Sequence, residues 1–467
     1  MFTLAQPRLR RLAKHIEHEM KLGLVGDALS SLAMDVSWVT DHSVASAAVA
    51  LSRPAQHTLS ISASVDRAGI TIAWNREGAA GSVANVKKLS CSADWVAASS
   101  AKQAVAAIVT ALVDGFRAPH LSVEQSYSLS VAWGIPLPST DLVWSRDIAV
   151  PVDASVTPAD TRLHLRPALT QALAEQGYPC VTVTAVVATA TATAVARAVE
   201  ATEEQGVVGG VGLVASAHVD MSVWVDPASL KKTKEVVAGQ GRVMVVTQLS
   251  RLGDKTQASD SVLPRNRFDD ELDQSSCNPG ESLFGKMTSG DHLAELVRLV
   301  LIHLMDQRII RRIESLLSRH ALSTKDVATC VEDDTDNLDA IKHLLAVTFR
   351  FKSLRSERRR VREVCDIVCR RAGVLLGTSV AAAIAVASSG KSGQTALPLC
   401  SVGVHGALYA HIPALKKSMG TTCGRLLRGD LPVGWSGLRL DYVRDAHVKG
   451  ALMLAAHNHD THAHDHA

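Results

Sequence analysis

Histidine is concentrated at the carboxyl end of this chain. The last eleven residues, HNHDTHAHDHA, hold two aspartates and five histidines, namely His457, His459, His462, His464 and His466. Imidazole and carboxylate groups at this density can bind Zn²⁺ or Ni²⁺ adventitiously. The other interpretation is a disordered polar tail over residues 457–467. We favour the tail, so the sequence predicts no specific metal ligand.

Two charged runs of opposite sign follow one another along the chain. Glu332 to Asp339 is acidic, and Arg350 to Arg362, RFKSLRSERRRVR, is basic. A basic run can bind nucleic acid, but aromatic residues do not interleave this one, and the net charge of the whole chain is only +3. A solvated helical face is therefore the favoured interpretation, and we predict no nucleic-acid partner.

Eight cysteines are scattered through the chain without a CxxC pair. This pattern favours reduced thiols in an intracellular protein. Cys365 and Cys369 are four residues apart and therefore share a helical face, where they can be core thiols or a redox pair. Core thiols are the favoured interpretation.

Length and composition indicate how many domains the chain has and whether it crosses a membrane. The chain has 467 residues, of which 47% are hydrophobic and 20% charged, so two or three globular domains are expected. The two longest apolar runs are Val181 to Val199, which is threaded with threonine, and Val374 to Ala387, which is short. We therefore predict no membrane span.

Apolar periodicity divides the chain into strands and helices. Alternating text predicts a three-strand meander within Ala45 to Trp74 and a strand over Tyr127 to Trp133. Further strands and helices alternate after it, and the carboxyl half becomes helical. The predicted helices there are Ile309 to Ser318, Asp339 to Val347 and Ser356 to Ala387.

The stretch Leu263 to Leu304 carries the most specific signal in the sequence. It begins with an extended Pro/Asp-rich piece, turns at Asn278-Pro279-Gly280 and enters an amphipathic helix. Its text (FDDELD, then SxNPGxxxFxKMxSG, then LAELVRLVL) resembles that of eukaryotic hexokinases, as do GVHGALY at Gly403 to Tyr409 and HEMxxGL at His18 to Leu24. The resemblance covers nearly the whole chain and implies a two-lobed α/β fold of the actin-like ATPase type, also called RNase H-like. It places residues 1–43 and 189–439 in a large lobe and residues 44–188 and 440–456 in a small lobe.

Phosphoryl transfer from ATP to a sugar needs a carboxylate base and backbone amides that bind the phosphates. The resemblance places the base at Thr189, whose hydroxyl cannot accept a proton near neutral pH, and losing a base costs about 10²- to 10⁴-fold in rate. The first phosphate hairpin falls on Leu51 to Thr58, where Pro54 has no N–H to donate. The second falls on Val214 to His218, which contains no glycine. We therefore expect neither a catalytic base nor a phosphate cradle.

The sugar pocket implied by the resemblance is altered as well. Its asparagine and glutamate positions hold apolar or neutral residues, namely Val246, Gln248, Gly285 and His218. On the adenosine side, His405 replaces an aspartate and Ala407 a small hydroxyl residue. Only Ser145 and Arg146 keep the character of the family's substrate-binding pair, and they are expected to be remnants.

These losses predict a non-catalytic structural or regulatory subunit that binds another protein or a larger assembly. No cofactor is expected, nor is binding of glucose or ATP. The alternative is a hexose-binding protein or a weakly active ATP-dependent hexose phosphotransferase. The expected location is intracellular and cytoplasmic. The segment Arg8 to Ile16 leaves open a second location, because it is similar to the import signal of peroxisome-type organelles; an amphipathic helix is the simpler interpretation.

Overall fold

A computed structural model describes most of the chain, with gaps between the described ranges. These ranges are residues 6–25, 35–40, 60–66, 69–75, 85–89, 101–117, 121–122, 125–134, 142–143, 163–202, 207–230, 241–254, 262–388, 399–427 and 437–464.

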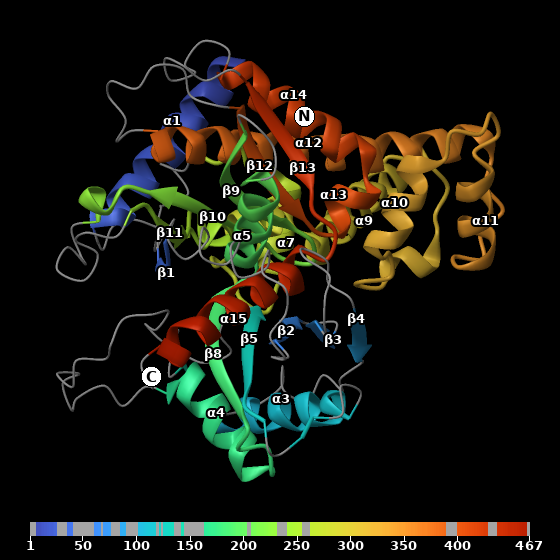
Figure 1. Cartoon of the computed structure of the whole chain (residues 1–467). Coiled ribbons are helices and arrows are strands. Elements are labelled where there is room, and N and C mark those ends of the chain that lie inside the picture. Colours follow the sequence, from blue (N-terminus) through green and yellow to red (C-terminus); the bar gives the residue numbers. More distant parts are fainter. Residues whose placement is uncertain are drawn as a thin grey trace.

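The chain forms two lobes, each built on its own β-sheet (Figure 1). In the large lobe the sheet has six strands in the order β1-β11-β10-β9-β12-β13. The first four strands pair antiparallel, and β9, β12 and β13 pair parallel. The strands are β1 (Asp35–Thr40), β9 (Val207–Ala215), β10 (Val219–Val225), β11 (Val243–Val246), β12 (Leu399–His405) and β13 (Leu438–Tyr442).

The small lobe contains a five-stranded sheet in the order β4-β3-β2-β5-β8. Here too an antiparallel meander, β4-β3-β2, continues into parallel strands, β5 and β8. Two helices pack on this sheet and complete a separate apolar core. The elements are β2 (Ser60–Asp66), β3 (Gly69–Asn75), β4 (Asn85–Leu89), α3 (Ala101–Phe116), β5 (Tyr127–Trp133), β6 (Leu142–Val143), β7 (Leu163–His164), α4 (Leu165–Glu175) and β8 (Val181–Ala188).

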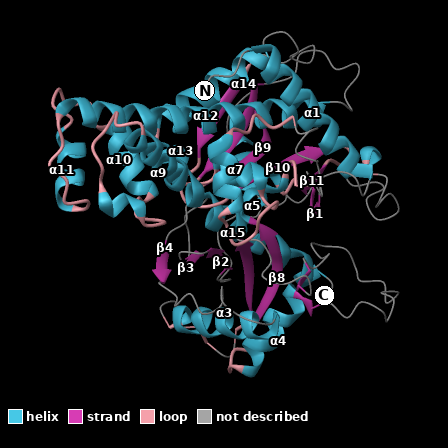
Figure 2. Ribbon diagram, turned by 180° about the vertical axis from the view of Figure 1, so that it is seen from behind, coloured by secondary structure: helices cyan, strands magenta, loops and turns pink. Residues whose placement is uncertain are grey.

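Two helices connect the lobes, α5 (Thr189–Thr202) and α15 (Ala446–His464), and both figures show them between the sheets (Figures 1 and 2). Helix α5 packs on β9 and β12 of the large lobe, while α15 packs on α5 and on β2 and β5 of the small lobe. The two helices touch through their backbones, because a Cβ at Gly450 would overlap the carbonyl of Ala192. Small side chains therefore set how closely the lobes approach. Helix α15 also continues into the predicted tail as far as His464.

Helices make up most of the rest of the large lobe. They are α1 (Gln6–Val25), α7 (Arg267–Gln274), α8 (Leu283–Thr288), α9 (Gly290–Asp306), α10 (Thr324–Glu332), α11 (Asp339–Val347), α12 (Arg355–Ser388), α13 (Ala407–His411) and α14 (Pro413–Leu427), with short 3₁₀ turns η2 (Pro227–Ser229), η4 (Leu249–Arg251) and η5 (Glu314–Leu317). Helix α12 is central and packs on α14, α1 and α9. It is long and apolar enough to cross a membrane, but 83% of its most apolar window is buried inside the protein. This burial is typical of a core helix.

Helix α1 contains the import-like segment Arg8 to Ile16. Its apolar face lies in the large-lobe core, where Leu12 is 1% exposed and Ile16 and Met20 are 0% exposed. The amphipathic helix predicted from the sequence is therefore confirmed.

Two predicted elements were wrong. The piece expected to be extended after Leu263 contains helix α7, which begins at a capping box: the Asn266 side chain accepts from the backbone N–H of Asp269, and the Asp269 carboxylate accepts from that of Asn266. The helix expected over Ile309 to Ser318 is only the turn η5. It fails because Arg308 has φ of 57° and the backbone N–H of Arg311 donates to Glu357 of α12 instead of to a helical carbonyl.

Candidate functional site

The predicted site positions gather where several elements end beside one another. Thr189 begins α5 directly after β8, and its neighbour Thr191 bonds Ser222 of β10 through their hydroxyls, 2.9 Å apart. A Cβ built at Gly406, after β12, would meet the side chain of Ser216 in the β9–β10 turn. The fold therefore brings together positions that lie far apart in the sequence.

Thr189 occupies the position of the expected base. It is 5% exposed, and its Oγ1 meets no hydrogen-bond partner among the residues that the structure describes. Its carbonyl accepts a 2.8 Å hydrogen bond from the hydroxyl of Thr193. Nothing in this described surrounding can activate the hydroxyl, since an alcohol needs an adjacent base to become reactive.

The turn between β9 and β10 presents carbonyl groups to the first turn of α9. The carbonyl of Ser216 accepts from the N–H of Gly290 at 2.7 Å, and that of Ala217 accepts from the N–H of Asp291 at 3.1 Å. Amides at a helix N-terminus can bind phosphate only while they remain available. Here the protein's own backbone occupies two of them.

Val246 ends β11, and Gln248 lies in the loop that follows. Gln248 is in the left-handed region with φ of 52°, and the next backbone N–H, of Leu249, donates to the carboxylate of Asp220 at 3.1 Å. The hydroxyl of Ser250 donates to the carbonyl of Val219. Both contacts fix this loop against β10.

Gly285 lies in α8, directly against that loop. A Cβ added to Gly285 would lie 3.0 Å from the Cβ of Ser250. This is closer than almost all real Cβ contacts, so the space that a side chain at position 285 would enter is occupied. A side chain at position 285 would therefore require Ser250 to shift.

A carboxylate that the sequence analysis missed lies beside this contact. Asp254 accepts hydrogen bonds from the backbone N–H groups of Ser282 and Leu283, at 2.9 and 3.0 Å, and thereby caps α8. Burial raises the pKa of Asp254 above its ordinary value, while the two N–H donors oppose that rise. Asp254 follows Gln248 and Ser250 closely in the sequence, and its contacts to α8 give it a structural role.

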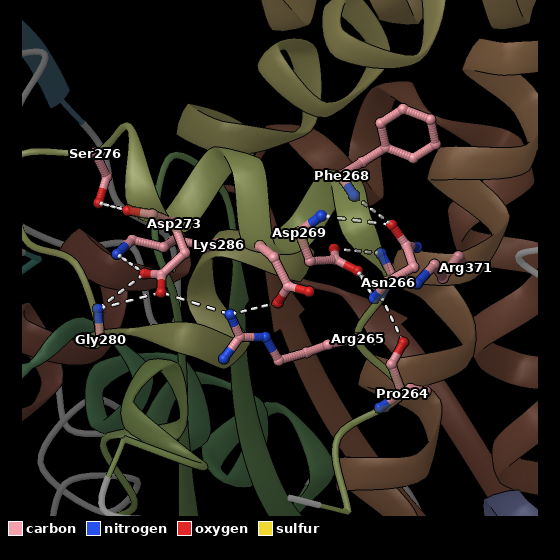
Figure 3. Close-up of polar contacts among 11 residues, drawn as sticks. Pro264, Arg265, Asn266, Phe268, Asp269, Asp273, Ser276, Gly280, Lys286 and Arg371 are labelled. Carbon is pink, nitrogen blue, oxygen red and sulfur yellow. Dashed lines mark hydrogen bonds and ion pairs between the residues drawn. The ribbon is translucent and has the colours of Figure 1, made fainter. Parts of the chain in front are cut away.

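The turn at Asn278-Pro279-Gly280 holds a buried ion pair (Figure 3). Lys286 is 2% exposed, and its Nζ donates at 2.7 Å both to Asp273 Oδ1 and to the carbonyl of Asn278. The N–H of Gly280 also donates to Asp273. The two charges therefore pair with each other and with the backbone of the turn.

A second buried ion pair ties this stretch to the central helix. Arg371 of α12 donates from two nitrogens to the two oxygens of Asp269, both at 2.8 Å, and also to the carbonyl of Pro264 (Figure 3). Removing one partner of such a pair is strongly destabilising, because the other charge stays buried. The ion pair between Asp269 and Arg371 thus stabilises the fold.

His405 ends β12, and its ring contacts that of His447 in the first turn of α15. Two imidazole rings therefore lie between the end of a parallel strand and the start of a helix. Such places commonly hold ligands in α/β proteins.

Several predicted positions lie outside the described residues, among them Leu51 to Thr58, Ser145 and Arg146. Among the described residues no group of three or more His, Cys, Asp or Glu side chains could hold a metal ion. Cys365 and Cys369 are both 0% exposed, which confirms them as core residues. Burial raises the pKa of Cys369 to about 12, so this thiol stays protonated and unreactive near neutral pH.

Three kinds of comparison agree on relatives of this chain. Residues 186–457 match the family model described as hexokinase. A 200-residue segment, 42% of this chain, is 32% identical to the hexokinase-like 1 protein of Arabidopsis thaliana and covers 40% of that protein. A 224-residue segment, 47% of this chain, is 30% identical to hexokinase-1 of Mus musculus and covers 22% of it. The matched segments thus span less than half the length of these relatives.

Solved structures resemble the chain over nearly its full length. The hexokinase of Schistosoma mansoni, solved in complex with glucose, has a TM-score of 0.75 at 21% identity and covers 97% of this chain, which covers 96% of it. A second crystal structure of a hexokinase has a TM-score of 0.67 at 18% identity and covers 98% of this chain, which covers 97% of it. At these identities the likeness establishes the shared two-lobed fold.

Proposed function

This chain belongs to the hexokinase family and has its actin-like fold, and from that premise we propose that it is a non-catalytic member acting as a structural or regulatory subunit through protein contacts. The observation that carries the proposal is Thr189. A buried hydroxyl that meets no described partner stands where the family resemblance places the carboxylate base. Without a base, proton removal from a sugar hydroxyl loses about 10²- to 10⁴-fold in rate.

The contacts around Thr189 support the same proposal. The place of a sugar carboxylate, Gly285, faces the side chain of Ser250, and the turn from Ser216 to His218 directs carbonyl groups at the amides of α9. Each of these arrangements stabilises the folded chain and lowers its capacity to hold a charged substrate. A chain retained for its surfaces is free to accumulate such changes.

The test is an assay for ATP-dependent phosphorylation of glucose, fructose and mannose by the purified protein. We expect no turnover above background, and the same result for Thr189→Val. A matched control is Thr110→Val, since Thr110 is exposed on helix α3 and its hydroxyl donates to the carbonyl of Ala106. Turnover that Thr189→Val abolishes and Thr110→Val leaves intact would overturn the proposal.

Ligand binding is measured separately, by thermal unfolding with glucose and with ATP-Mg²⁺. A ligand at about 100 times its dissociation constant stabilises a protein by about 2.7 kcal/mol, which raises the melting temperature of a chain this size by a few degrees. We expect no shift. A rise with glucose in the absence of turnover would favour the hexose-binding alternative.

The positive part of the proposal is tested by cross-linking and purification from the native source. A partner protein recovered in a fixed ratio to this chain supports the role of a subunit. Recovery of the chain alone, as a monomer, contradicts it.

A further inference from the structure

Helix α11 and the start of α12 lie at the end of the large lobe farthest from α1 (Figures 1 and 2). We use the name tip for residues 308–315 and 332–359, which include α11 and the start of α12. Six large apolar side chains among the described residues are exposed, and three of them belong to the tip: Ile309 (52%), Val347 (61%) and Leu354 (58%). Exposed apolar side chains are ordinary singly, but a group of three within one surface favours contact with another molecule.

Hydrogen bonds join separate segments of the tip. The guanidinium of Arg311 donates to Glu357 at 2.7 and 2.8 Å and to the carbonyl of Lys352, and the hydroxyl of Ser315 donates to the carbonyl of Phe349. The segment 308–315 is thus packed against 349–357. The loop at 336–337 packs against the same helix, because Arg355 donates to the carbonyl of Asp336 and Arg358 to that of Asn337.

The tip carries two strips of opposite charge. The basic strip comprises Arg350, Lys352 and Arg359, and the acidic strip comprises Glu332, Asp334, Asp336 and Asp339; all seven residues are exposed. None of their charged groups forms an ion pair with any residue that the structure describes. Even the contact from Arg355 is made to the backbone carbonyl of Asp336 and not to its carboxylate.

The basic strip and the acidic strip lie next to each other. A two-fold axis that runs between them therefore brings the basic strip of one copy onto the acidic strip of a second copy. In a symmetric dimer the same surface of both copies meets, so the basic strip of one copy faces the acidic strip of the other. The exposed apolar side chains lie in the same surface and are covered by the contact. The charged residues would lie at the edge of this contact. Charged groups there determine which partner binds and speed its association, and burial of the apolar side chains stabilises the complex.

We propose that the tip of the large lobe is a self-association surface whose occupant is a second copy of this chain. The surface joins the two copies by their large lobes and leaves α5, α15 and the small lobe outside the contact. The inference rests on the proposed role in protein contacts, for which it names a surface. Their failures are distinguishable, because sugar phosphorylation tests the absence of catalysis and molecular mass tests self-association.

The test uses the full chain in sedimentation experiments over a range of concentrations. One variant reverses the basic strip (Arg350→Glu, Lys352→Glu, Arg359→Glu), and the other reverses the acidic strip (Glu332→Lys, Asp334→Lys, Asp336→Lys). We expect the unmodified chain to form a dimer. Each variant alone should associate at least about 100-fold more weakly, since like charges facing one another cost several kcal/mol.

An equimolar mixture of the two variants is the decisive measurement. In the mixed dimer both rim contacts again join opposite charges, so association should return to that of the unmodified chain. A matched control reverses two exposed basic residues of the small lobe, Lys102→Glu and Arg117→Glu, and should leave the dimer intact. Salt should weaken the dimer, because the Debye length falls from about 30 Å at 0.01 M to about 3 Å at 1 M.

Three results would overturn the inference. A chain that remains monomeric at every concentration excludes a second copy as the occupant. A dimer that both reversals leave unchanged places the contact elsewhere. A monomer that binds polyglutamate or RNA through the basic strip assigns the tip to an acidic protein or a nucleic acid. Melting curves of both variants that match the unmodified chain exclude unfolding as the cause of any loss.

Discussion

His405 and His447 lie ring against ring, with centroids 4.3 Å apart and planes inclined by 44°. His405 belongs to β12 of the large-lobe sheet, and His447 belongs to α15, which also packs on β2 and β5 of the small lobe. The contact therefore helps to attach the connecting helix to the large lobe.

We predict that the two rings are energetically coupled. Aromatic pairs contribute about 0.5–1.5 kcal/mol beyond the area they bury, so His405→Ala and His447→Ala should together cost less than the sum of the single changes. A double-mutant cycle measured by urea unfolding gives the coupling. The pair Phe116 and Tyr178, with centroids 5.5 Å apart inside the small lobe, is the reference. Strict additivity at the histidines would contradict the prediction.

The contact between Gly285 and Ser250 predicts that a carboxylate at position 285 is poorly tolerated. Gly285→Glu should destabilise the chain by about 1–3 kcal/mol, the usual cost of overpacking, and should not produce activity. Adding Ser250→Gly opens the space and should recover most of that loss. Thermal unfolding of the single and double variants measures both effects.

A matched control for this prediction is Gly424→Glu. Gly424 lies in helix α14, and a Cβ there would meet nothing within 4 Å. Replacing a helical glycine with a good helix former gains about 1 kcal/mol. Equal effects of glutamate at positions 285 and 424 would show that Ser250 does not close the space.

Thr189 gives a prediction about stability as well as catalysis. Its hydroxyl is buried without a described partner, and such a group costs about 1–3 kcal/mol. Thr189→Val keeps the shape and removes the hydroxyl, so it should leave stability unchanged or raise it. A loss of more than about 1 kcal/mol would show that the hydroxyl is bonded.

Restoring the base should fail to restore catalysis. Thr189→Asp places a carboxylate at a site that is 5% exposed, and residues that act as a catalytic unit are strongly non-additive. We expect lower stability and no sugar phosphorylation. Even modest turnover from this single change would mean that the other predicted losses are misplaced.

Glu357 predicts how one part of the stability depends on pH. Hydrogen bonds from Arg311 lower the pKa of Glu357 from 4.5 to about 2, although burial opposes the shift. The stabilisation it gives is complete above pH 4.5 and is lost as the pH falls toward 2. In Arg311→Ala the pKa of Glu357 in the folded chain returns toward its ordinary value. The difference in free energy of unfolding between the unmodified chain and this variant should therefore become smaller as the pH falls from 4.5 toward 2.

Urea unfolding at a series of pH values measures that gap. Arg312→Ala is the control, since Arg312 is 61% exposed and pairs with the exposed Glu314, a contact of the kind that contributes little. A gap for Arg311→Ala that stays constant from pH 6 to pH 2 would contradict the assignment.

Local sequence signals predicted individual elements well where side-chain periodicity matched burial. The strand over Tyr127–Trp133 and the helix over Asp339–Val347 were predicted with the bounds that the structure has. Helix α7 was missed because only two of its eight residues, Phe268 and Leu272, are apolar, although Asn266 followed by Asp269 is the signature of a helix start. The segment after Arg308 failed for the opposite reason, since its apolar spacing is helical but side chains from α12 hold its backbone.

Predicting the site requires knowing which residues far apart in the sequence contact one another, and apolar periodicity does not give that information. The resemblance placed Gly285 and Gln248 in one pocket, yet no pattern in the sequence indicated that Ser250 would face the missing side chain. The cap that Asp254 makes on α8 was likewise not predicted, because it joins residues 28 and 29 positions apart in the sequence. Contacts of this kind require the fold before they can be seen.

The burial of Ile16 has a consequence for the time course of synthesis. The apolar face of α1 packs on α12, yet roughly 330 residues separate Val25 from Arg355. At about 5–20 residues per second, the ribosome takes on the order of tens of seconds to deliver that partner. During this interval α12 cannot cover the apolar face of α1, and a chaperone or, if the segment Arg8 to Ile16 is an import signal, its receptor can bind there. Once α12 has packed on α1, the apolar face is buried and no longer accessible.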